Sequence, residues 1–262
     1  MTTQLALKQM ANSAPVMDKL NGLLGTPELA ASFASSMISV VASNPMLQRC
    51  EPKSVLGAAM VAAMLRLPLI PSLGMAYVVP FKNQAQFQIG YKGLVELALR
   101  SGQFRTIINE VVYEGQLVSM NRFTGEYIWQ EARKSDKPVG VMARFDLVNG
   151  FSKTIYWTME EIETHAKKYS QAYRSGYSSP WKSDFLAMAK KTVLKSLLNK
   201  YAPKSLELMQ ALRYDQAAVK ADPEHLDIET MEPEYVDNSR VQAAVEEDVK
   251  PQNLMDDGTA QQ

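Results

Sequence analysis

The stretch QAQFQIGYKGLVELALRSGQFR, at residues 84–105, predicts the fold of the chain around it. It begins as a strand, because amide and apolar side chains alternate along residues 84–89. Gly90 and Gly93 follow, and a missing Cβ at each lets the backbone turn sharply or approach another surface closely. A short helix comes next and is expected to end at Gly102 in a left-handed C-terminal cap.

Charged side chains recur every fourth residue on that helix, at Lys92, Glu96 and Arg100. Such a ridge is typical of solvated ion pairs, each worth about 0.2–0.5 kcal/mol. The same cations would also suit backbone phosphates. Both interpretations of Lys92 and Arg100 therefore stay open.

Four segments of the chain carry a recognisable pattern: LPLIPSLGMAYVVPF at residues 67–81, QIGYKGLVELALRSG at 88–102, VYEG at 112–115 and WKSDFLAMAKKTVLK at 181–195. In this order they resemble the RecT family of phage and prophage single-strand DNA annealing proteins, over most of residues 50–200. The resemblance implies a compact core of β-sheet and helices that assembles into rings or helical filaments. It also implies a partner exonuclease and a C-terminal region that contacts other replication or recombination proteins.

Length and composition are those of one domain with appendages, because 262 residues with 46% apolar content can bury a sizeable core. Cys50 has no second cysteine to pair with, and no signal-like segment opens the chain, so a reducing cytoplasm is expected. The longest uncharged apolar run, residues 55–65, is much shorter than the roughly 20 residues of a spanning helix. No membrane segment is expected.

Charge is distributed unevenly along the chain, although the formal total is zero. Residues 220–262 hold 3 basic and 12 acidic residues, a net charge of −9, so residues 1–219 carry +9. A basic body indicates a polyanionic ligand. We therefore expect a DNA-binding and oligomerisation core at residues 1–215 and an acidic, largely disordered tail at residues 216–262.

The remaining patterns predict an α+β fold, with N-terminal helices, a central and mostly antiparallel sheet of hairpins packed against helices, and C-terminal helices. Small residues dominate the expected helices at residues 10–24, 28–41 and 52–65. These helices could form an oligomerisation surface or an ordinary layer that covers the core, and both interpretations stay open.

Strands are expected at residues 76–89 as a hairpin, then at 106–113, at 117–129 with an internal turn, and at 139–157 as a hairpin. Asn149-Gly150 is the turn of the last hairpin, since both positions tolerate positive φ. Thr158 and Glu161 predict a capping box that starts a helix to about residue 169. Further helices are expected at residues 180–201 and 205–214.

Aromatic residues recur every fourth position at Tyr169, Tyr173, Tyr177 and Trp181, interleaved with cations. Aromatic faces stack on bases and cations hold phosphates, as in single-strand binders that read no sequence. The alternative is that these aromatics belong to the core, above all Trp181, which begins an apolar stripe. Further along, Lys191 and Lys195 lie one helical turn apart, and their spacing predicts an exposed ridge that suits backbone phosphates.

We thus expect a single-strand DNA interface without a catalytic residue, a metal or a cofactor. The chain has no GxxxxGK[ST] motif for a nucleoside triphosphate, and its two histidines lack metal-site spacing. The candidate DNA-binding residues are Lys82, Tyr91, Lys92, Arg100, Arg105, Arg122, Lys167, Lys168, Tyr173, Arg174, Tyr177, Lys182, Lys191 and Lys195.

The resemblance to the RecT family implies ATP-independent pairing of complementary strands in phage homologous recombination, by a homo-oligomer in the cytoplasm of the bacterial host. The partners that it implies are single-stranded DNA, the annealed duplex, an exonuclease and a host single-strand binding protein. One alternative is a metal-dependent phage nuclease whose carboxylates come from distant strands. Another is a structural phage protein without a nucleic-acid role, which would leave the basic body unexplained.

Overall fold

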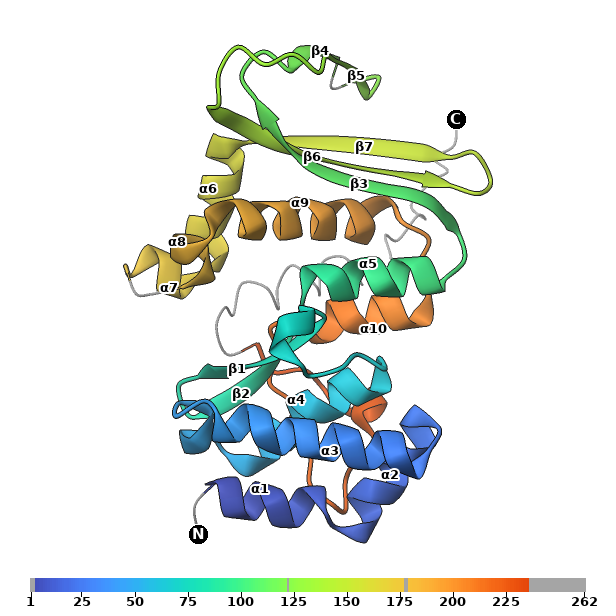
Figure 1. Ribbon diagram of the computed structural model, residues 1–262, viewed down its shortest axis with the longest axis vertical. Coiled ribbons are helices and arrows are strands. Elements are labelled where there is room, and N and C mark those ends of the chain that lie inside the picture. The colour runs from blue at the N-terminus through green and yellow to red at the C-terminus, as the bar shows by residue number, and fades with distance from the viewer. Residues whose placement is uncertain (1–2, 122, 177–178, 236–262) are drawn as a thin grey trace, which may run out of the picture.

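The computed structural model of the protein describes residues 3–121, 123–176 and 179–235. Figure 1 shows an elongated molecule with the N-terminal helices at one end and a three-stranded sheet toward the other. Every strand pair is antiparallel, and the strands form three small sheets. Helices precede and follow the strands in the described chain, so the expected α+β class is confirmed.

The N-terminal end consists of α1 (Thr3–Ala11), α2 (Ala14–Leu24), α3 (Pro27–Ala42) and α4 (Pro52–Met64), with a 3₁₀ turn η1 (Leu47–Arg49) before α4. Helix α4 is the centre of this end, because it is buried on nearly all sides and contacts α1, α2 and β2 (Gln84–Ile89). The expected single helix at residues 10–24 is wrong. The chain breaks at Ser13, which is extended, and Pro15 favours the first turn of a new helix.

The 84–105 stretch folds as its pattern predicts. A 3₁₀ turn η2 (Pro71–Leu73) leads into β1 (Ala76–Phe81), which pairs with β2, and α5 (Tyr91–Arg100) follows at once. A Cβ on Gly90 would lie 2.0 Å from the Gly74 carbonyl oxygen, and one on Gly93 would lie 2.2 Å from that of Met75. Close backbone approach is therefore confirmed as the reason for these glycines, and Gly102 has the expected left-handed φ of 68°.

The three-stranded sheet has the order β3 (Phe104–Tyr113), β6 (Pro138–Leu147), β7 (Ser152–Thr158). The β6–β7 hairpin turns at Asn149-Gly150, where Gly150 has a φ of 90°, so that prediction is confirmed. One face of β6 is buried from Val141 to Leu147 at every second residue. A separate hairpin, β4 (Leu117–Asn121) and β5 (Glu126–Trp129), extends from this sheet at the far end of the molecule (Figure 1).

Helices α6 (Met159–Tyr169), α7 (Gln171–Arg174), α8 (Pro180–Ser183), α9 (Phe185–Tyr201) and α10 (Leu206–Tyr214) follow the sheet. The capping box is confirmed: Glu161 N–H donates to Thr158 Oγ1, and Thr158 N–H donates to the Glu161 carboxylate. The expected continuous helix at residues 180–201 is wrong. Asp184 interrupts it with extended φ and caps α9 by accepting a hydrogen bond from Ala187 N–H.

The chain continues to pack beyond α10, in what we call the C-terminal segment (residues 216–235), which includes a 3₁₀ turn η3 (Ile228–Thr230). Phe87 N–H donates to the Ala217 carbonyl, so this segment adds to the free edge of β2. Val219 and Ala221 are buried, and Lys53 pairs with Asp222 at 2.9 Å. The expected start of a tail at residue 216 is therefore too early. Residues 236–262 lie outside the described chain.

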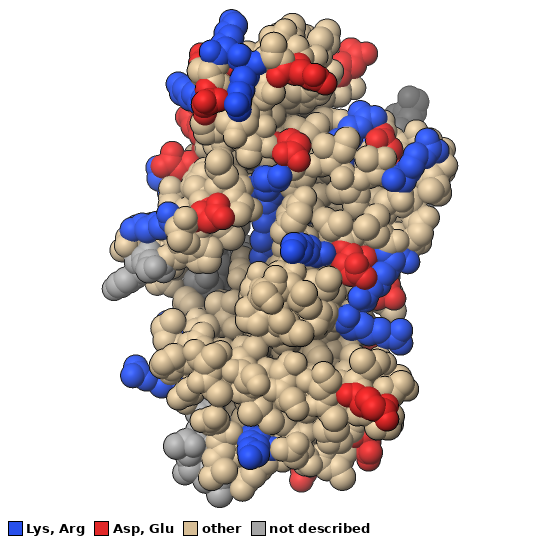
Figure 2. Space-filling model, in the orientation of Figure 1, with Lys and Arg blue, Asp and Glu red and all other residues tan. Residues whose placement is uncertain are grey.

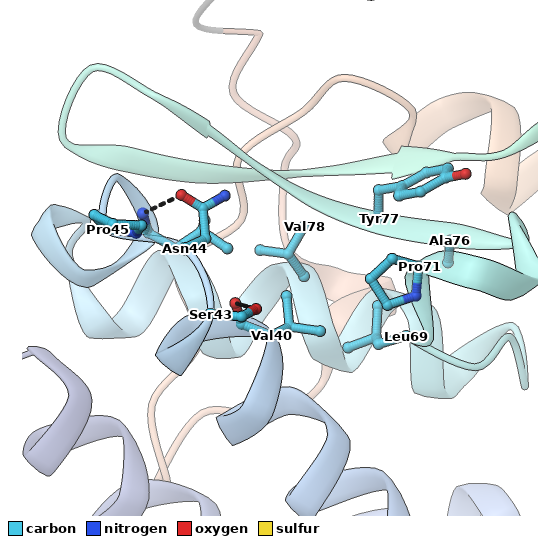
Figure 3. Close-up of a pocket in the computed structure, with 10 residues that line it drawn as sticks. Val40, Ser43, Asn44, Pro45, Leu69, Pro71, Ala76, Tyr77 and Val78 are labelled. Carbon is cyan, nitrogen blue, oxygen red and sulfur yellow. Dashed lines mark hydrogen bonds between the residues drawn. The ribbon is translucent and has the colours of Figure 1, made fainter.

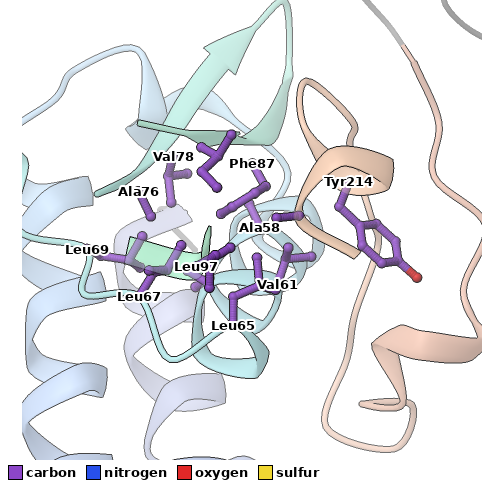
Figure 4. Packing of buried hydrophobic residues seen from close by; sticks show 14 of the residues in the cluster. Ala58, Val61, Leu65, Leu67, Leu69, Ala76, Val78, Phe87, Leu97 and Tyr214 are labelled. Carbon is purple, nitrogen blue, oxygen red and sulfur yellow. The ribbon is translucent and has the colours of Figure 1, made fainter. Parts of the chain in front are cut away.

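The core joins helices to the first hairpin. Figure 4 shows Ala58 and Val61 of α4 near Phe87 of β2 and Leu97 of α5, with Tyr214 at the end of α10 close by. Tyr214 is fully buried, and its hydroxyl donates to the Ile228 carbonyl at 2.7 Å. The C-terminal segment is thus tied to the same core that α4 centres.

Candidate nucleic-acid interface

Lys191 and Lys195 lie one turn apart on α9, as their spacing predicts. The expectation of a fully exposed ridge is wrong, because both side chains are half-buried, that of Lys195 with 33% of its surface exposed. Helix α9 packs against the three-stranded sheet on one side and contacts α5 on another. The two lysines therefore lie where the sheet layer meets the rest of the molecule.

Asp215 is the anion that these lysines face. Its side chain is 1% exposed, its Oδ1 accepts a hydrogen bond from Ile89 N–H at 3.0 Å, and its Oδ2 is hydrogen-bonded to Lys195 Nζ. Burial raises the pKa of Asp215, but Lys195, Lys191 and the two hydrogen bonds outweigh burial and hold the pKa below its usual value. Burial lowers the pKa of Lys191, and Asp215 offsets part of that effect.

Arg100 of α5 links this helix to the C-terminal end of α4. Its guanidinium donates to the Leu65 carbonyl at 2.8 Å and the Arg66 carbonyl at 3.1 Å, at the C-terminal end of α4, and pairs with Glu96 at 3.0 Å. These contacts use most of its donors. Of the two interpretations of this ridge, the structure thus supports the ion pair for Arg100 and adds a cap on α4.

The other candidates from the first half of the chain lie apart from one another. Lys82 is exposed at the β1–β2 turn with a left-handed φ of 54° and its ammonium 5.6 Å from the Phe81 ring centre. Lys92 is exposed and Tyr91 half-buried on the first turn of α5. Arg105 is exposed at the start of β3, and its guanidinium reaches the Val148 carbonyl at 3.5 Å. Arg122 lies outside the described residues.

The aromatic repeat divides between core and surface. Trp181 is 7% exposed and packs against Phe185, and Tyr173 contacts both rings, so the core interpretation holds for Trp181 and for much of Tyr173. Tyr169 contacts His165, with ring centres 4.5 Å apart. Tyr177 lies outside the described residues.

The cations of α6 to α8 remain at the surface. Lys167 is exposed and pairs with Glu163 at 2.8 Å, and Lys168 is exposed over the Tyr169 ring at 5.0 Å. Arg174 is exposed, and Lys182 donates to the Gly176 carbonyl. These side chains are exposed on α6, α7 and α8, where a polyanion can reach them.

His165 lies close to the lysines of α9. Burial, then the charges of Lys195 and Lys168, lower its pKa to about 4. Its ring contacts Trp157, with centres 5.4 Å apart, and its Nδ1 has no hydrogen-bond partner in the described chain. The imidazole is therefore neutral near pH 7 and acts as a packed aromatic ring.

A basic and aromatic recess that the sequence patterns did not predict lies against the β4–β5 hairpin. It is a cavity of about 260 Å³, whose lining includes Tyr127, Lys153, Lys200 and Tyr201. The Lys153 ammonium lies 4.7 Å from the centre of the Tyr201 ring. The sequence of β7 holds Lys153, Tyr156 and Trp157 within five residues, and such a composition equally fits a half-buried strand.

A second cavity, of about 330 Å³, lies between the end of α3 and β1. Figure 3 shows Val40, Leu69, Pro71 and Val78 around it. Its lining contains no Lys or Arg, so it offers no cation to a phosphate.

Figure 2 shows Lys and Arg side chains near the middle of one face, between the sheet layer and α5, whereas the N-terminal helices show few charges there. Packing of the C-terminal segment also changes the charge of the body. Residues 220–235 hold one basic and six acidic residues, so the net charge of residues 1–235 is +4 rather than the +9 of residues 1–219. Positive charge is therefore concentrated in parts of the surface, and Lys191 and Lys195 of α9 form one of these parts.

Comparison with known proteins identifies the family of this chain. The family model described as RecT family matches residues 31–232, which is most of the chain. The chain belongs to the RecT family. Two relatives agree with this assignment: the protein YqaK of Bacillus subtilis is 39% identical over 260 residues, which cover 96% of this chain and 89% of YqaK. The RecT protein of Escherichia coli is 32% identical over 259 residues, which cover 88% of this chain and 94% of RecT.

Membership in the RecT family confirms the expected resemblance and places the chain among recombination proteins that bind and anneal single-stranded DNA. The match runs from α3 through η3, so it includes both the α9 lysines and most of the C-terminal segment. Among the described residues, no three His, Cys, Asp or Glu side chains lie together as a metal site requires. None of the helices in the described ranges is long and apolar enough to cross a bilayer.

Proposed function

We propose that this RecT-family protein anneals complementary single strands without ATP, as a homo-oligomer that holds backbone phosphates and leaves base edges free. The observation that carries the proposal is the half-buried lysine pair of α9, which Asp215 links to strand β2 in a chain of this family. Two cations and one carboxylate leave an excess of positive charge, and a phosphodiester carries one negative charge. Such a surface binds the backbone and does not read the bases.

The exposed cations of α6 to α8 support a path for the strand that continues from this junction. Lys168, Arg174 and Lys182 lie on successive short helices that lead into α9. The recess beside the β4–β5 hairpin adds aromatic rings and two more lysines. Sequence-independent binding and strong salt dependence follow from such a combination.

Assembly into a ring or filament is part of the proposal. The N-terminal end exposes several large apolar side chains, namely Leu5, Leu29, Met46, Ile70 and Leu73. A neighbouring copy would cover them. We further propose that the oligomer acts in the bacterial cytoplasm, where an exonuclease supplies its strands and a host single-strand binding protein competes for them.

Strand annealing between two dye-labelled complementary oligonucleotides tests the function directly. We expect faster pairing with the protein than without it, no requirement for ATP, and intact strands after incubation with Mg²⁺ or Mn²⁺. Cleaved strands would instead favour the nuclease alternative, and failure to bind DNA at low salt would favour a structural protein. Light scattering of the same samples measures the oligomer.

The double variant Lys191→Gln, Lys195→Gln tests the location of the interface. Loss of two phosphate contacts should flatten the slope of log affinity against log salt by about 1.4, or about 0.7 for each contact to a single strand. The control is Lys8→Gln in α1 with Lys137→Gln just before β6, because both lysines are exposed and the pair removes the same charge. Equal slopes for the two double variants would show that α9 is not the phosphate surface.

A further inference from the structure

Asp215 lies among the groups that we assign to DNA binding, yet a carboxylate repels phosphate. Of the acidic side chains in the described ranges, it is the one that is buried. Burial of an unpaired carboxylate is costly, so its position calls for a reason beyond solubility. Its partners are Lys195 of α9 and the backbone N–H of Ile89, the residue that precedes Gly90 in the 84–105 stretch.

We infer that Asp215 is a positioning residue for phosphate binding: it fixes the Lys195 ammonium at the junction between α9 and β2, where a DNA phosphate enters. This inference rests on the proposed function and names a group that acts through Lys195 rather than on DNA.

The geometry supports this role because Asp215 is held from two sides. Its Oδ1 is anchored by a strand, and a backbone N–H cannot swing away as a side chain can. Its Oδ2 then offers one fixed acceptor to a long, flexible lysine. A Lys ammonium has three donors, so Lys195 keeps donors for a phosphate after it bonds Asp215.

The charge balance supports the same role. Lys191 lies within the influence of both Asp215 and Lys195, and His165 on the neighbouring α6 is neutral near pH 7. With both lysines protonated, the cluster carries one positive charge in excess in a half-buried place. A phosphodiester of charge −1 neutralises that excess, while Asp215 prevents the lysines from repelling each other out of position.

The test uses the full chain and fluorescence anisotropy with a labelled oligothymidylate at fixed salt. Asp215→Asn keeps the shape and an acceptor for Ile89 N–H but turns an amide toward Lys195. Asp215→Glu keeps the charge but moves it by one methylene. If Asp215 positions Lys195, both variants bind about three- to tenfold more weakly, since the lysine must be ordered on binding. A mere charge effect makes Asp215→Asn bind more tightly and leaves Asp215→Glu unchanged.

A coupling measurement separates positioning from general damage to the fold. In a Lys195→Gln background, Asp215→Asn should change affinity by less than about twofold, because the side chain that it positions is absent. An equal loss in both backgrounds would overturn the inference, as would parental affinity of both Asp215 variants. Melting curves show which variants are folded at the assay temperature. If Asp215→Asn is unfolded there, the affinity of Asp215→Glu tests the inference. A parent protein that fails to bind oligothymidylate would refute the proposed function itself.

Discussion

Gly57 on α4 lies directly against the backbone of Val219, so closely that a Cβ on residue 57 would be 1.9 Å from the Val219 carbonyl oxygen. The obstacle is backbone, which cannot rotate out of the way. The N-terminal core and the C-terminal segment therefore meet at a contact that only glycine permits.

Gly57→Ala should destabilise the protein by about 1–3 kcal/mol, because an added methyl group overpacks a buried contact. Urea unfolding followed by circular dichroism measures this change. The matched control is Gly22→Ala in α2, where nothing lies within 4 Å of the added Cβ and a gain of about 0.5–1 kcal/mol is expected. Equal changes in the free energy of unfolding for the two variants would contradict a tight contact between Gly57 and Val219.

Truncation after residue 216 should abolish cooperative unfolding and annealing, because it removes the Ala217 carbonyl that accepts from Phe87 N–H and the apolar residues that cover α4. Truncation after residue 235 should preserve both. The shorter deletion removes two basic and six acidic residues, so single-strand binding at low salt should strengthen. Melting curves and annealing rates of the two truncated proteins decide; a stable, active protein that ends at residue 216 would refute this account of the segment.

Arg100→Gln should lower the free energy of unfolding by about 1–2 kcal/mol, because the carbonyls of Leu65 and Arg66 lose charged donors. The salt dependence of DNA binding should stay as in the parent. Arg105→Gln is the control, since its long bond to Val148 predicts little change in stability. A reduced salt slope with unchanged stability would place Arg100 on the DNA instead.

His165 should make the protein less stable in weak acid. Its pKa is lowered to about 4 in the folded chain from 6.5, so between these values the unfolded state binds more protons and stability falls as pH falls. The expected loss from this group between pH 7 and pH 5 is about 2 kcal/mol, at about 1.4 kcal/mol per pH unit well below 6.5. Urea unfolding at both pH values measures it.

The variant His165→Phe keeps an aromatic ring between Trp157 and Tyr169 and cannot titrate. Its stability should change less between pH 7 and pH 5, by the amount that His165 contributes. The same pH dependence in parent and variant would mean that other groups cause the acid effect.

Local signals made much of the fold predictable. The alternation at residues 84–89, the Asn149-Gly150 turn and the Thr158 capping box each depend on residues within a few positions of one another, and all three are found. Breaks within helices were harder to predict, because Asp184 reads as one more polar residue in an apolar stripe. Its role as a cap depends on backbone angles that the stripe does not reveal.

The candidate site was less predictable, because its contacts join distant parts of the chain. Arg100 has helical spacing from Glu96, yet its bonds to the end of α4 arise only when α5 packs there. Asp215 directly precedes the expected start of the acidic tail at residue 216, and composition cannot distinguish it from the exposed carboxylates that follow, such as Asp227 and Glu229. What singles it out is the strand amide of Ile89 and the lysine of α9, which folding brings together.

The covering of α4 by the C-terminal segment also sets an order of events during translation. Helix α4 leaves the ribosome early, but the residues that close its last side, 217–221, are made close to the end of the described chain. A nascent chain therefore carries an open apolar face on its first-made core until that late segment emerges. Closure of this face therefore cannot precede synthesis of residues 217–221, and until then the chain exposes the kind of apolar surface that makes unfinished chains prone to aggregation.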